Sequence, residues 1–489
     1  MSINVSQKRI DEEKFLDMRK KVISLWPTTK EIDLDEAVEY QRNLPDSKRF
    51  YKQLQKVNEE NRMVLFPRAG TPILEDEIKL IRTLNDLGIV LTPLTTDSYT
   101  RNLQLDKAQQ GLEESIKTGK PKLNGYPIIN HGIKNNRKLV ESCNSCFDPR
   151  CSRAANSLVA EMAFASGMTA MPCSFFAWIG GYDKKATVEE FIETAQYMGR
   201  LMGYYADHGV IISTDCHGWL PNGVIPMSVN IATQIIEALV AIGQGTKCVM
   251  PQVNLQGSLA QDLGDIRAVP KLYKKYFEKL GYKDVIIPGI VGSQVPLYPF
   301  PQDVGSAFGY ITYTAMVAAL GKVPVAFLKT IDEALGVPSL ESHVQTYKAC
   351  TWIFNVVRTQ DFEVNNEDIL QEEKITEAEV TAILDKVLDL GDGDVVVGSV
   401  KAVEAGVLDS PFSINVHAKD KVLGIRDLKG ACRYLDFGNL PIPDEIKEFH
   451  RKKIAERSES EGRKMDYHVS LEDFWAISKG QIIGKPANR

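Results

Sequence analysis

The alternation of short apolar runs with amphipathic helical stretches most constrains how this chain folds. It extends over residues 63–328, and the helical stretches include EDEIKLIRTLNDLG and TVEEFIETAQYMGRLMGYYADHG. The candidate strands are MVLF (63–66), IVLT (89–92), YPII (126–129), TAMPC (169–173), VIIS (210–213), CVMP (248–251), DVIIP (284–288) and VPVAFL (323–328). Strands that alternate with helices predict a parallel sheet, and their number fits a (β/α)8 TIM barrel.

The segments around this core follow other patterns. Adding CNSCF (143–147) gives nine candidate strands, so one of the nine is not a barrel strand, and the pattern does not say which. Residues 1–60 read as charged helices, the first of them stopped by Pro27. Residues 361–489 begin with an acidic helix, continue through VVVGSVKAVEAGVLDSPF with glycine turns, and end in a charged helical tail. We therefore expect a helical N-terminal extension (1–60), a catalytic barrel (61–360) and an α+β C-terminal extension (361–489).

Charge and hydropathy exclude several classes of protein. A net charge of −6 disfavours a general nucleic-acid surface, which requires a basic excess. No apolar run is long enough to span a membrane, and the polar N-terminal stretch has no signal core. We therefore expect a cytoplasmic protein with neither nucleic acid nor membrane as a partner. In such a protein the eight cysteines are free thiols or ligands rather than disulfides.

Three of the cysteines fall in nine residues, CNSCFDPRC (143–151). This spacing suggests a metal site, but no second C-x-x-C completes a zinc tetrad. Cys173 or Cys216 supplies a fourth ligand only if the fold brings it close. A cysteine-bound metal or iron–sulfur centre is therefore an alternative reading of the chain.

Arginines follow three successive candidate strands. Arg68 comes after MVLF, Arg101 after IVLTPLTT, and Arg150 after the CNSCF segment. One such arginine is usually a surface residue, but the ends of barrel strands meet at one mouth, where three guanidinium groups suit a small anion. Dicarboxylate and phosphate both remain open. The usual nucleophile, Walker and H-E-x-x-H motifs are absent, and the run Asp215–Gly218 is either an acid–base or metal pair or a hydrogen-bonded loop.

Nine stretches carry a resemblance that extends over nearly the whole chain. They are WPTTKEIDLDEAVEY (26–40), PRAG (67–70), DSYTR (97–101), LNGYP (123–127), FPQD with AFG nearby (300–309), KTIDEALGVP (329–338), GSVKAVEAGVLDSPF (398–412), RYLDFGNLP (433–441) and ISKGQIIGKP (477–486). In this order they resemble the epsilon, or large catalytic, subunit of glutamate mutase, also called methylaspartate mutase.

The resemblance implies a fold, a cofactor and a partner. Members of the family are (β/α)8 barrels with extensions at both ends, and they bind adenosylcobalamin between the barrel and a small subunit with an Asp-x-His-x-x-Gly motif. The present chain lacks that motif, because Leu220 stands where the glycine is needed after Asp215-Cys216-His217. The resemblance therefore implies a small cobalamin-binding subunit and a hetero-oligomer, a heterotetramer in the family. It also implies a radical rearrangement of a small dicarboxylic acid, with no acid–base catalytic residue.

The resemblance also assigns residues. The substrate-binding positions are Arg68, Arg101, Arg150, Cys151, Pro172, Trp178 and Tyr182. The cofactor-binding positions are Gly70, Asn124, Gly181, His217, Phe300, Lys329, Glu333 and Val337. Lys329 and Glu333 resemble a pair that holds the adenosyl ribose, and they share a helical face if the turn after VPVAFL is helical.

Several of these positions depart from the family pattern. Pro172 stands where the family has the glutamate that meets the substrate's amino group, and Trp178 replaces a tyrosine. His217 replaces a phenylalanine, Cys151 a histidine, and Gly181 a proline. A buried ammonium without its carboxylate costs several kcal/mol. Either Asp148 or Asp215 replaces that carboxylate, or the substrate lacks the amine. Phe175, Phe176 and Trp178 either narrow the site or pack its loop. A non-catalytic scaffold for the cobalamin subunit is a further alternative.

Overall fold

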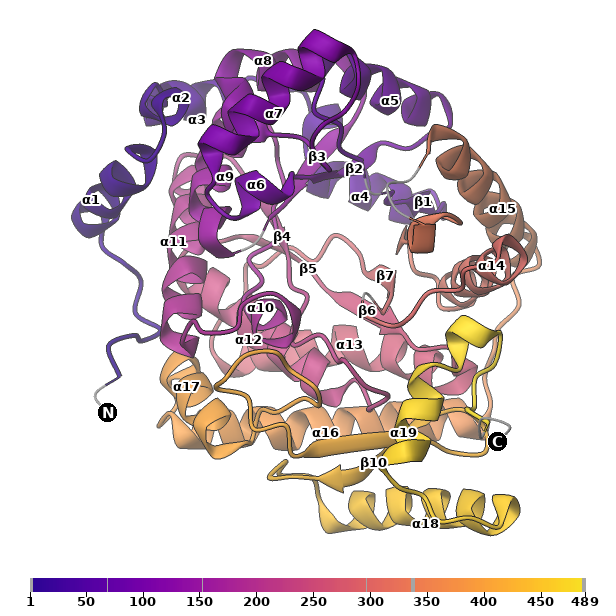
Figure 1. The fold of residues 1–489 in the computed structure, drawn as a ribbon. Helices are drawn as coiled ribbons and strands as arrows, with labels where there is room; N and C mark the ends of the chain where they lie inside the picture. Colours follow the sequence, from indigo (N-terminus) through magenta and orange to yellow (C-terminus); the bar gives the residue numbers. More distant parts are fainter. Residues whose placement is uncertain (1–2, 68, 152, 296, 336–338, 486–489) are drawn as a thin grey trace.

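The computed structural model describes residues 3–67, 69–151, 153–295, 297–335 and 339–485. Arg68 and Val337 lie outside the described residues. The fold is a mixed α/β fold with parallel strands, as the alternating pattern predicts. In Figure 1 the strands lie at the centre and most helices of the first 360 residues surround them. Among the described helices, none is both long and apolar enough to cross a membrane.

Most strands pair in parallel with the strand that comes before or after them in the chain. The strands are β1 (Val64–Leu65), β2 (Leu91–Thr95), β3 (Cys146–Arg150), β4 (Ser213–Asp215), β5 (Cys248–Met250), β6 (Gln252–Leu255), β7 (Val291–Gln294) and β8 (Val325–Phe327). One sheet has the order β1-β8-β7-β6, and β2-β3 and β4-β5 form parallel pairs. Single parallel bridges join Ala69 to Leu94 of β2 and Ala170 to Ser213 of β4. The first of these eight strands, β1, therefore lies beside the eighth, β8.

Helices connect these strands. They are α5 (Leu74–Asp86), α6 (Ser98–Arg101), α7 (Leu105–Thr118), α8 (Ile128–Ser142), α9 (Arg153–Ala165), α10 (Phe176–Gly181), α11 (Val188–Asp207), α12 (Ser228–Gly243), α13 (Leu259–Lys279), α14 (Val304–Leu320), η2 (Glu333–Leu335) and α15 (Leu340–Thr359). A capping box of Thr187 and Glu190 starts α11. The left-handed Gly119 ends α7, because glycine adopts that conformation without strain.

Three predicted strands, YPII, TAMPC and DVIIP, each make only a single bridge, and that of TAMPC joins Ala170 to Ser213. Tyr126 in YPII makes one bridge to Thr96, and α8 begins two residues later. DVIIP makes one bridge, between Ile286 and Cys248, and the strand itself is β7, a few residues further along. The sequence of β7, VGSQ, is polar because Ser293 and Gln294 line a cavity, so an apolar pattern does not reveal it.

The terminal segments differ from the sequence prediction in two places. The N-terminal elements are α1 (Glu12–Ile23), α2 (Pro27–Lys30), α3 (Leu34–Arg42), η1 (Asp46–Lys48) and α4 (Phe50–Glu59). Pro27 does not stop α1 but starts α2. The first residue of a helix has no intrahelical partner for its N–H, so proline, which lacks this N–H, fits there. The C-terminal elements are α16 (Glu367–Leu390), α17 (Val395–Ala405), β9 (Val422–Arg426), β10 (Cys432–Phe437), α18 (Asp444–Glu461), α19 (Tyr467–Phe474) and η3 (Ile477–Lys479). The stretch after Asp394 is thus a helix rather than a series of glycine turns.

A small apolar cluster closes one end of the strands. It contains residues at or near the beginnings of several strands, among them Val64, Leu91 and Cys146, together with Phe50 and Leu54 of α4. The Phe50 ring meets the Phe66 ring edge-on, with centroids 5.7 Å apart. Because α4 covers the amino ends of the strands, a site between the strands opens at their carboxyl ends.

Candidate active site

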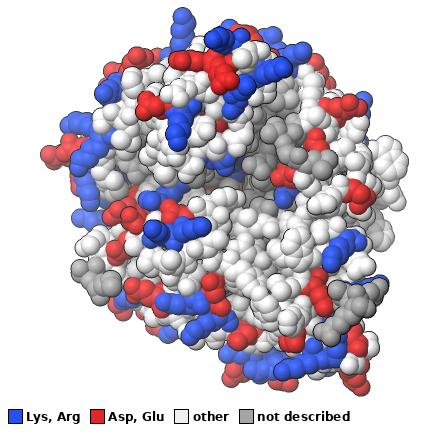
Figure 2. Space-filling view, in the orientation of Figure 1, with Lys and Arg blue, Asp and Glu red and all other residues white. Residues whose placement is uncertain are grey.

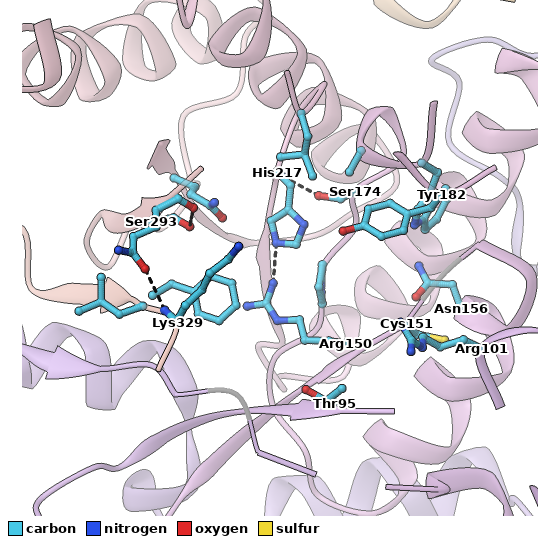
Figure 3. Close-up of a pocket in the computed structure, with 18 residues that line it drawn as sticks. Thr95, Arg101, Arg150, Cys151, Asn156, Ser174, Tyr182, His217, Ser293 and Lys329 are labelled. Carbon is cyan, nitrogen blue, oxygen red and sulfur yellow. Dashed lines mark hydrogen bonds between the residues drawn. The ribbon is translucent and has the colours of Figure 1, made fainter. Parts of the chain in front are cut away.

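A cavity of about 170 Å³ lies where the strands end. Its described lining is Thr95, Arg101, Arg150, Cys151, Asn156, Pro172, Ser174, Ala177, Trp178, Tyr182, His217, Leu220, Gln252, Ser293, Gln294, Phe327, Leu328 and Lys329. Thr95, Arg150 and Gln294 are the last residues of three different strands. Figure 2 shows a hollow on this face, and Figure 3 shows the lining side chains. One water occupies ~30 Å³ in the liquid, so the cavity is large enough for a small organic molecule.

Arg150 lies at the base of the cavity and has three protein partners. Its Nη1 donates to Oδ2 of Asp215 at 2.8 Å and lies 2.5 Å from Nε2 of His217. Its Nη2 donates to Oδ2 of Asp148. The guanidinium carbon is 5.1 Å from the Phe66 ring centroid and 5.3 Å from that of Phe327. This cation–π environment and the charge pairs hold the side chain in one place.

The two aspartates beside Arg150 differ in ionisation. Both are buried, and neither is among the described residues that line the cavity. Burial raises the pKa of Asp148 well above its usual range, although Arg150 acts to lower it. Burial also opposes ionisation of Asp215, but Arg150 and His217 outweigh it and hold the pKa of Asp215 below its usual range. Asp215 therefore carries the negative charge that balances Arg150.

A buried glutamate of α12 holds the wall formed by residues 172–182. The Glu237 carboxylate accepts hydrogen bonds from the backbone N–H groups of Phe175 and Phe176, each at 2.7 Å, and of Gly218 at 2.9 Å. The Ser174 hydroxyl donates to the same carboxylate at 3.2 Å. Burial raises the pKa of Glu237 to about 7. One side chain thus joins the wall before α10 to the loop after β4.

The aromatic residues of this wall divide into two groups. Trp178 and Tyr182 line the cavity, whereas Phe175 and Phe176 are fully buried. The Phe176 ring stacks on Trp219, with centroids 5.9 Å apart. The two phenylalanines therefore pack the loop, and Trp178 is the aromatic residue that narrows the cavity.

The loop after β8 forms another wall. The Lys329 backbone N–H donates to Oε1 of Gln294 at 3.0 Å. The Lys329 ammonium lies 5.4 Å from the centroid of the Phe300 ring. Glu333 begins the 3-10 turn η2, and residues 328–332 are not α-helical, so the condition under which Lys329 and Glu333 would share an α-helical face is not met. Both residues nevertheless belong to one short loop beside the cavity.

The structure brings together many of the residues that the sequence singled out. Arg101, Arg150, Cys151, Pro172, Trp178, Tyr182, His217 and Lys329 line the cavity. Gly70, Asn124, Gly181, Phe300 and Glu333 are not among its described lining. Of these, Gly70 packs against Thr95, and the Asn124 side chain accepts a hydrogen bond from Ser98 N–H at the start of α6. Arg68 and Val337 lie outside the described residues.

Sequence reasoning missed several polar residues of the lining. Asn156, Ser293, Gln294 and Gln252 were not predicted. Ser293 and Gln294 end a strand, which is the signal that identified Arg150, but β7 itself was not recognised. Asn156 lies on α9, where no local pattern marks it.

The cysteine motif does not gather around one point. The Cys143 and Cys146 thiols are buried and lie near different carbonyl oxygens, those of Ile78 and Ser47. Cys151 lines the cavity. Among the residues that the structure describes, no group of three or more His, Cys, Asp or Glu side chains could hold a metal ion.

Comparisons with known proteins agree on one family. The model of a family described as methylaspartate mutase E chain (MutE) matches residues 44–486. The chain is 36% identical over 485 residues to a glutamate mutase epsilon subunit of Desulfitobacterium hafniense (strain Y51), covering 99% of this chain and 100% of that protein. It is 34% identical over 483 residues to that of Treponema denticola, covering 99% of each, and 31% identical over 482 residues to that of Haloarcula marismortui, covering 98% and 97%.

Proposed function

The chain belongs to the methylaspartate mutase E chain family, and we propose that it is the catalytic subunit of an adenosylcobalamin-dependent carbon-skeleton mutase. We propose further that its substrate is a small carboxylic acid that lacks the amino group of glutamate. The reaction is then an isomerisation in which the protein binds and orients the acid and excludes water from it.

The composition of the cavity wall carries the substrate proposal. Arg101, Arg150 and Lys329 contribute three cationic side chains, and no aspartate or glutamate is among the described lining. Asp148 and Asp215, the two expected replacements for the missing glutamate, are buried and paired with Arg150. An ammonium group placed here would lose its water without gaining a carboxylate, which costs several kcal/mol. An amine-free acid avoids that penalty.

The rim of the cavity fits the adenosyl group of the cofactor. Lys329 lines the cavity beside Phe300, and Glu333 follows in the same loop. The Lys329 ammonium and the Glu333 carboxylate would bind the ribose hydroxyls. Asn124 and the backbone at Gly70 and Gly181 are further cofactor positions. The family resemblance adds His217, which stands at a cofactor-binding position where the family has a phenylalanine. When bound, the cofactor supplies a carbon-centred radical, and the chain's own groups hold the substrate near it.

The surface beside the cavity supports a partner subunit. Tyr182 is 53% exposed, and the nearby Val416 is 71% exposed. The segment 414–416 lies beside α10, because the backbone N–H of Ile414 donates to the carbonyl oxygen of Gly180. Figure 2 shows uncharged residues over much of the face around the hollow. We propose that a small cobalamin-binding subunit covers this face in a hetero-oligomer, consistent with the name epsilon subunit that the relatives carry.

We also propose that the parallel strands form a (β/α)8 barrel, with residues 1–60 and 361–489 as extensions of a barrel at 61–360. Support comes from the pairing of β1 with β8 and from the bridge between Ala170 and β4. Residues around Ala170 then provide the strand between β3 and β4, and β5 and β6 form one continuous strand.

Substrate profiling of the assembled enzyme tests the proposed function. The chain is combined with a cobalamin-binding subunit of the same family and adenosylcobalamin, and L-glutamate is compared with glutarate and other amine-free acids. We expect isomerisation of an amine-free acid and little turnover of L-glutamate. Turnover of L-glutamate at a comparable rate would refute the substrate proposal. Absence of a cobalamin-dependent radical signal with every acid would refute the mutase proposal.

A further inference from the structure

Gln252, the first residue of β6, contributes an uncharged amide to the lining of the cavity. Its Nε2 donates to Oδ1 of Asn254, two residues further along the same strand, at 3.0 Å. Its Oε1 accepts no hydrogen bond from the described residues, and neighbouring atoms do not seal this oxygen off completely. The Gln252 side chain therefore offers the cavity a neutral hydrogen-bond acceptor.

Backbone groups fix the direction of the buried amide network to which Gln252 belongs. At one end, Nδ2 of Asn230 in α12 donates to the carbonyl oxygens of His217 and Trp219, at 2.7 and 3.1 Å. A carbonyl oxygen can only accept, so Oδ1 of Asn230 is the acceptor for Nδ2 of Asn254 at 2.8 Å. Oδ1 of Asn254 is then left to accept from Gln252. Turning the Gln252 amide over would set two acceptor oxygens against each other.

Gln234 anchors the same network at a second point. Its Oε1 accepts from the backbone N–H of Gln252 at 3.2 Å, and a backbone N–H can only donate. Its Nε2 then donates to Oδ1 of Asn230 at 2.7 Å. Each amide residue of the network is at most 2% exposed, so water does not compete for these hydrogen bonds. Both anchors require the same direction along the network, which holds Nε2 of Gln252 on Asn254 and leaves Oε1 for the cavity.

We infer that Gln252 is a specificity-determining residue whose Oε1 accepts a hydrogen bond from a hydroxyl group of the substrate. The inference rests on the proposed function and narrows its substrate to a hydroxy acid. The acid's carboxylate binds among the cationic side chains of Arg101, Arg150 and Lys329, and its hydroxyl reaches Gln252. An ammonium group also donates hydrogen bonds, but here it would add a fourth positive charge and gain no carboxylate, whereas a hydroxyl brings no charge.

Calorimetric binding to the full chain tests this recognition without any activity measurement. Glutarate is compared with hydroxyglutarates that carry one hydroxyl on the second carbon, in either configuration, or on the third. We expect one of these hydroxy acids to bind about fivefold more tightly than glutarate, because it gains one neutral hydrogen bond. Equal or weaker binding of every hydroxy acid would overturn the inference, since Oε1 would then bind only water.

Replacing the amide tests whether Gln252 is responsible for the preference. Gln252→Met keeps a side chain of similar length without a strong acceptor. We expect it to weaken binding of the preferred hydroxy acid about fivefold and to change that of glutarate little. Gln345→Met, at an exposed position on α15, is the matched control and should keep the preference. Equal losses for the hydroxy acid and glutarate in Gln252→Met would contradict the inference.

Asn254→Leu tests the orientation separately, because it removes the acceptor that holds Nε2 and leaves Gln252 in place. The amide can then present either end to the cavity. We therefore expect a preference for the hydroxy acid that is smaller than in the original chain. An undiminished preference would show that the network does not orient Gln252.

The two proposals fail in different ways. If the hydroxy-acid preference and its dependence on Gln252 are found but no acid supports a cobalamin-dependent radical, the proposed function is wrong and the recognition by Gln252 stands. If amine-free acids isomerise and Gln252→Met affects the hydroxy acid and glutarate equally, the mutase proposal stands and the role of Gln252 is wrong.

Discussion

Single residues at buried positions decide what this cavity accepts. Pro172 lines the cavity, and its ring brings no charge to the position where the family resemblance expects a carboxylate. The described lining itself contains no acid, and the charge of Arg150 is balanced from behind it by Asp215. Under the proposed function, the chemistry at residue 172 therefore separates an amine-binding site from an amine-free one.

Restoring that carboxylate gives the first prediction. We expect Pro172→Glu to improve the binding of L-glutamate relative to glutarate by about 10-fold or more, because the ammonium gains a buried partner. Calorimetry with both ligands gives the ratio of the two dissociation constants. Pro172→Gln has nearly the same shape without the charge and should leave the ratio near its original value. An unchanged ratio in both variants would show that no ammonium is placed beside residue 172.

A second residue prediction concerns Glu77, whose carboxyl is fully buried in α5. It accepts a hydrogen bond at 2.7 Å from the N–H of Thr71, which lies in the segment between β1 and α5. Burial raises the pKa of Glu77 from 4.5 to about 8. The folded chain therefore holds this proton more tightly than the unfolded chain. The stability that this proton contributes is complete below pH ~4.5 and is lost as pH rises to about 8.

Glu77→Gln removes that titration and keeps an acceptor for Thr71. We expect the variant to gain stability relative to the original chain between pH 5 and 8, by roughly 1.4 kcal/mol per pH unit at most. Urea unfolding at several pH values measures this difference. Glu75→Gln, on the exposed first turn of the same helix, should show little such dependence. A difference between Glu77→Gln and the original chain that does not vary with pH would contradict the assignment.

Helices and strands were predictable to different degrees. Helices α5, α11 and α16 have a 3.6-residue apolar period, and α11 and α16 also have capping residues, so the sequence revealed them. β7 was missed, since its end faces a polar cavity and thus has no apolar run. YPII predicted a strand because it is a short apolar run, and such a run alone does not separate a strand from the first turn of a buried helix.

Residues of the site could be predicted from the sequence only where they end a strand or match the family resemblance. Arg150 was found because it ends β3. The ion pair between Arg150 and Asp215 was not predicted, because it depends on how the end of β3 lies relative to β4. Glu237 gave no signal, because a lone glutamate in the apolar helix α12 has no local pattern that shows what it binds. Contacts between distant elements therefore account for most of what the sequence did not reveal.

Close packing between elements leads to a third prediction. Gly203 of α11 lies against the turn after α12, where a Cβ atom would approach the Gln244 carbonyl oxygen to 2.3 Å. We expect Gly203→Ala to destabilise the chain by about 1–3 kcal/mol, because the backbone of that turn must move. Gly309→Ala is the matched control: this glycine lies in α14 with no atom within 4 Å of the added Cβ. That variant should be neutral or stabilised by up to about 1 kcal/mol.

Urea unfolding of the two glycine variants measures these changes. A destabilised Gly203→Ala beside an unaffected Gly309→Ala would locate the cost in the α11–α12 contact. If the two variants changed equally, helix propensity rather than close approach would explain the result.

At the scale of the whole molecule, the C-terminal segment is tied to the central helices by buried polar contacts. Arg433 of β10 pairs with Glu372 of α16, and both side chains are almost completely buried. The Thr376 hydroxyl donates to Asp265 of α13 at 2.7 Å, and Arg426 donates to the carbonyl oxygen of Gln256 at 2.7 Å. Figure 1 shows α16 lying along α13. These contacts predict that residues 367–485 and the residues before them unfold together.

Removing one partner of the buried pair tests this cooperativity. We expect Glu372→Gln to lower the free energy of unfolding by about 3 kcal/mol, because Arg433 loses one of its two buried carboxylate partners and keeps only Asp427. The loss should shift one common transition in far-UV circular dichroism and tryptophan fluorescence, since Trp219 lies in the earlier part and Trp475 in the later. Lys429→Ala, which removes an exposed pair with Asp368, should change stability by less than about 1 kcal/mol. Two separated transitions, with only the C-terminal one shifted, would show instead that this segment folds as a unit of its own.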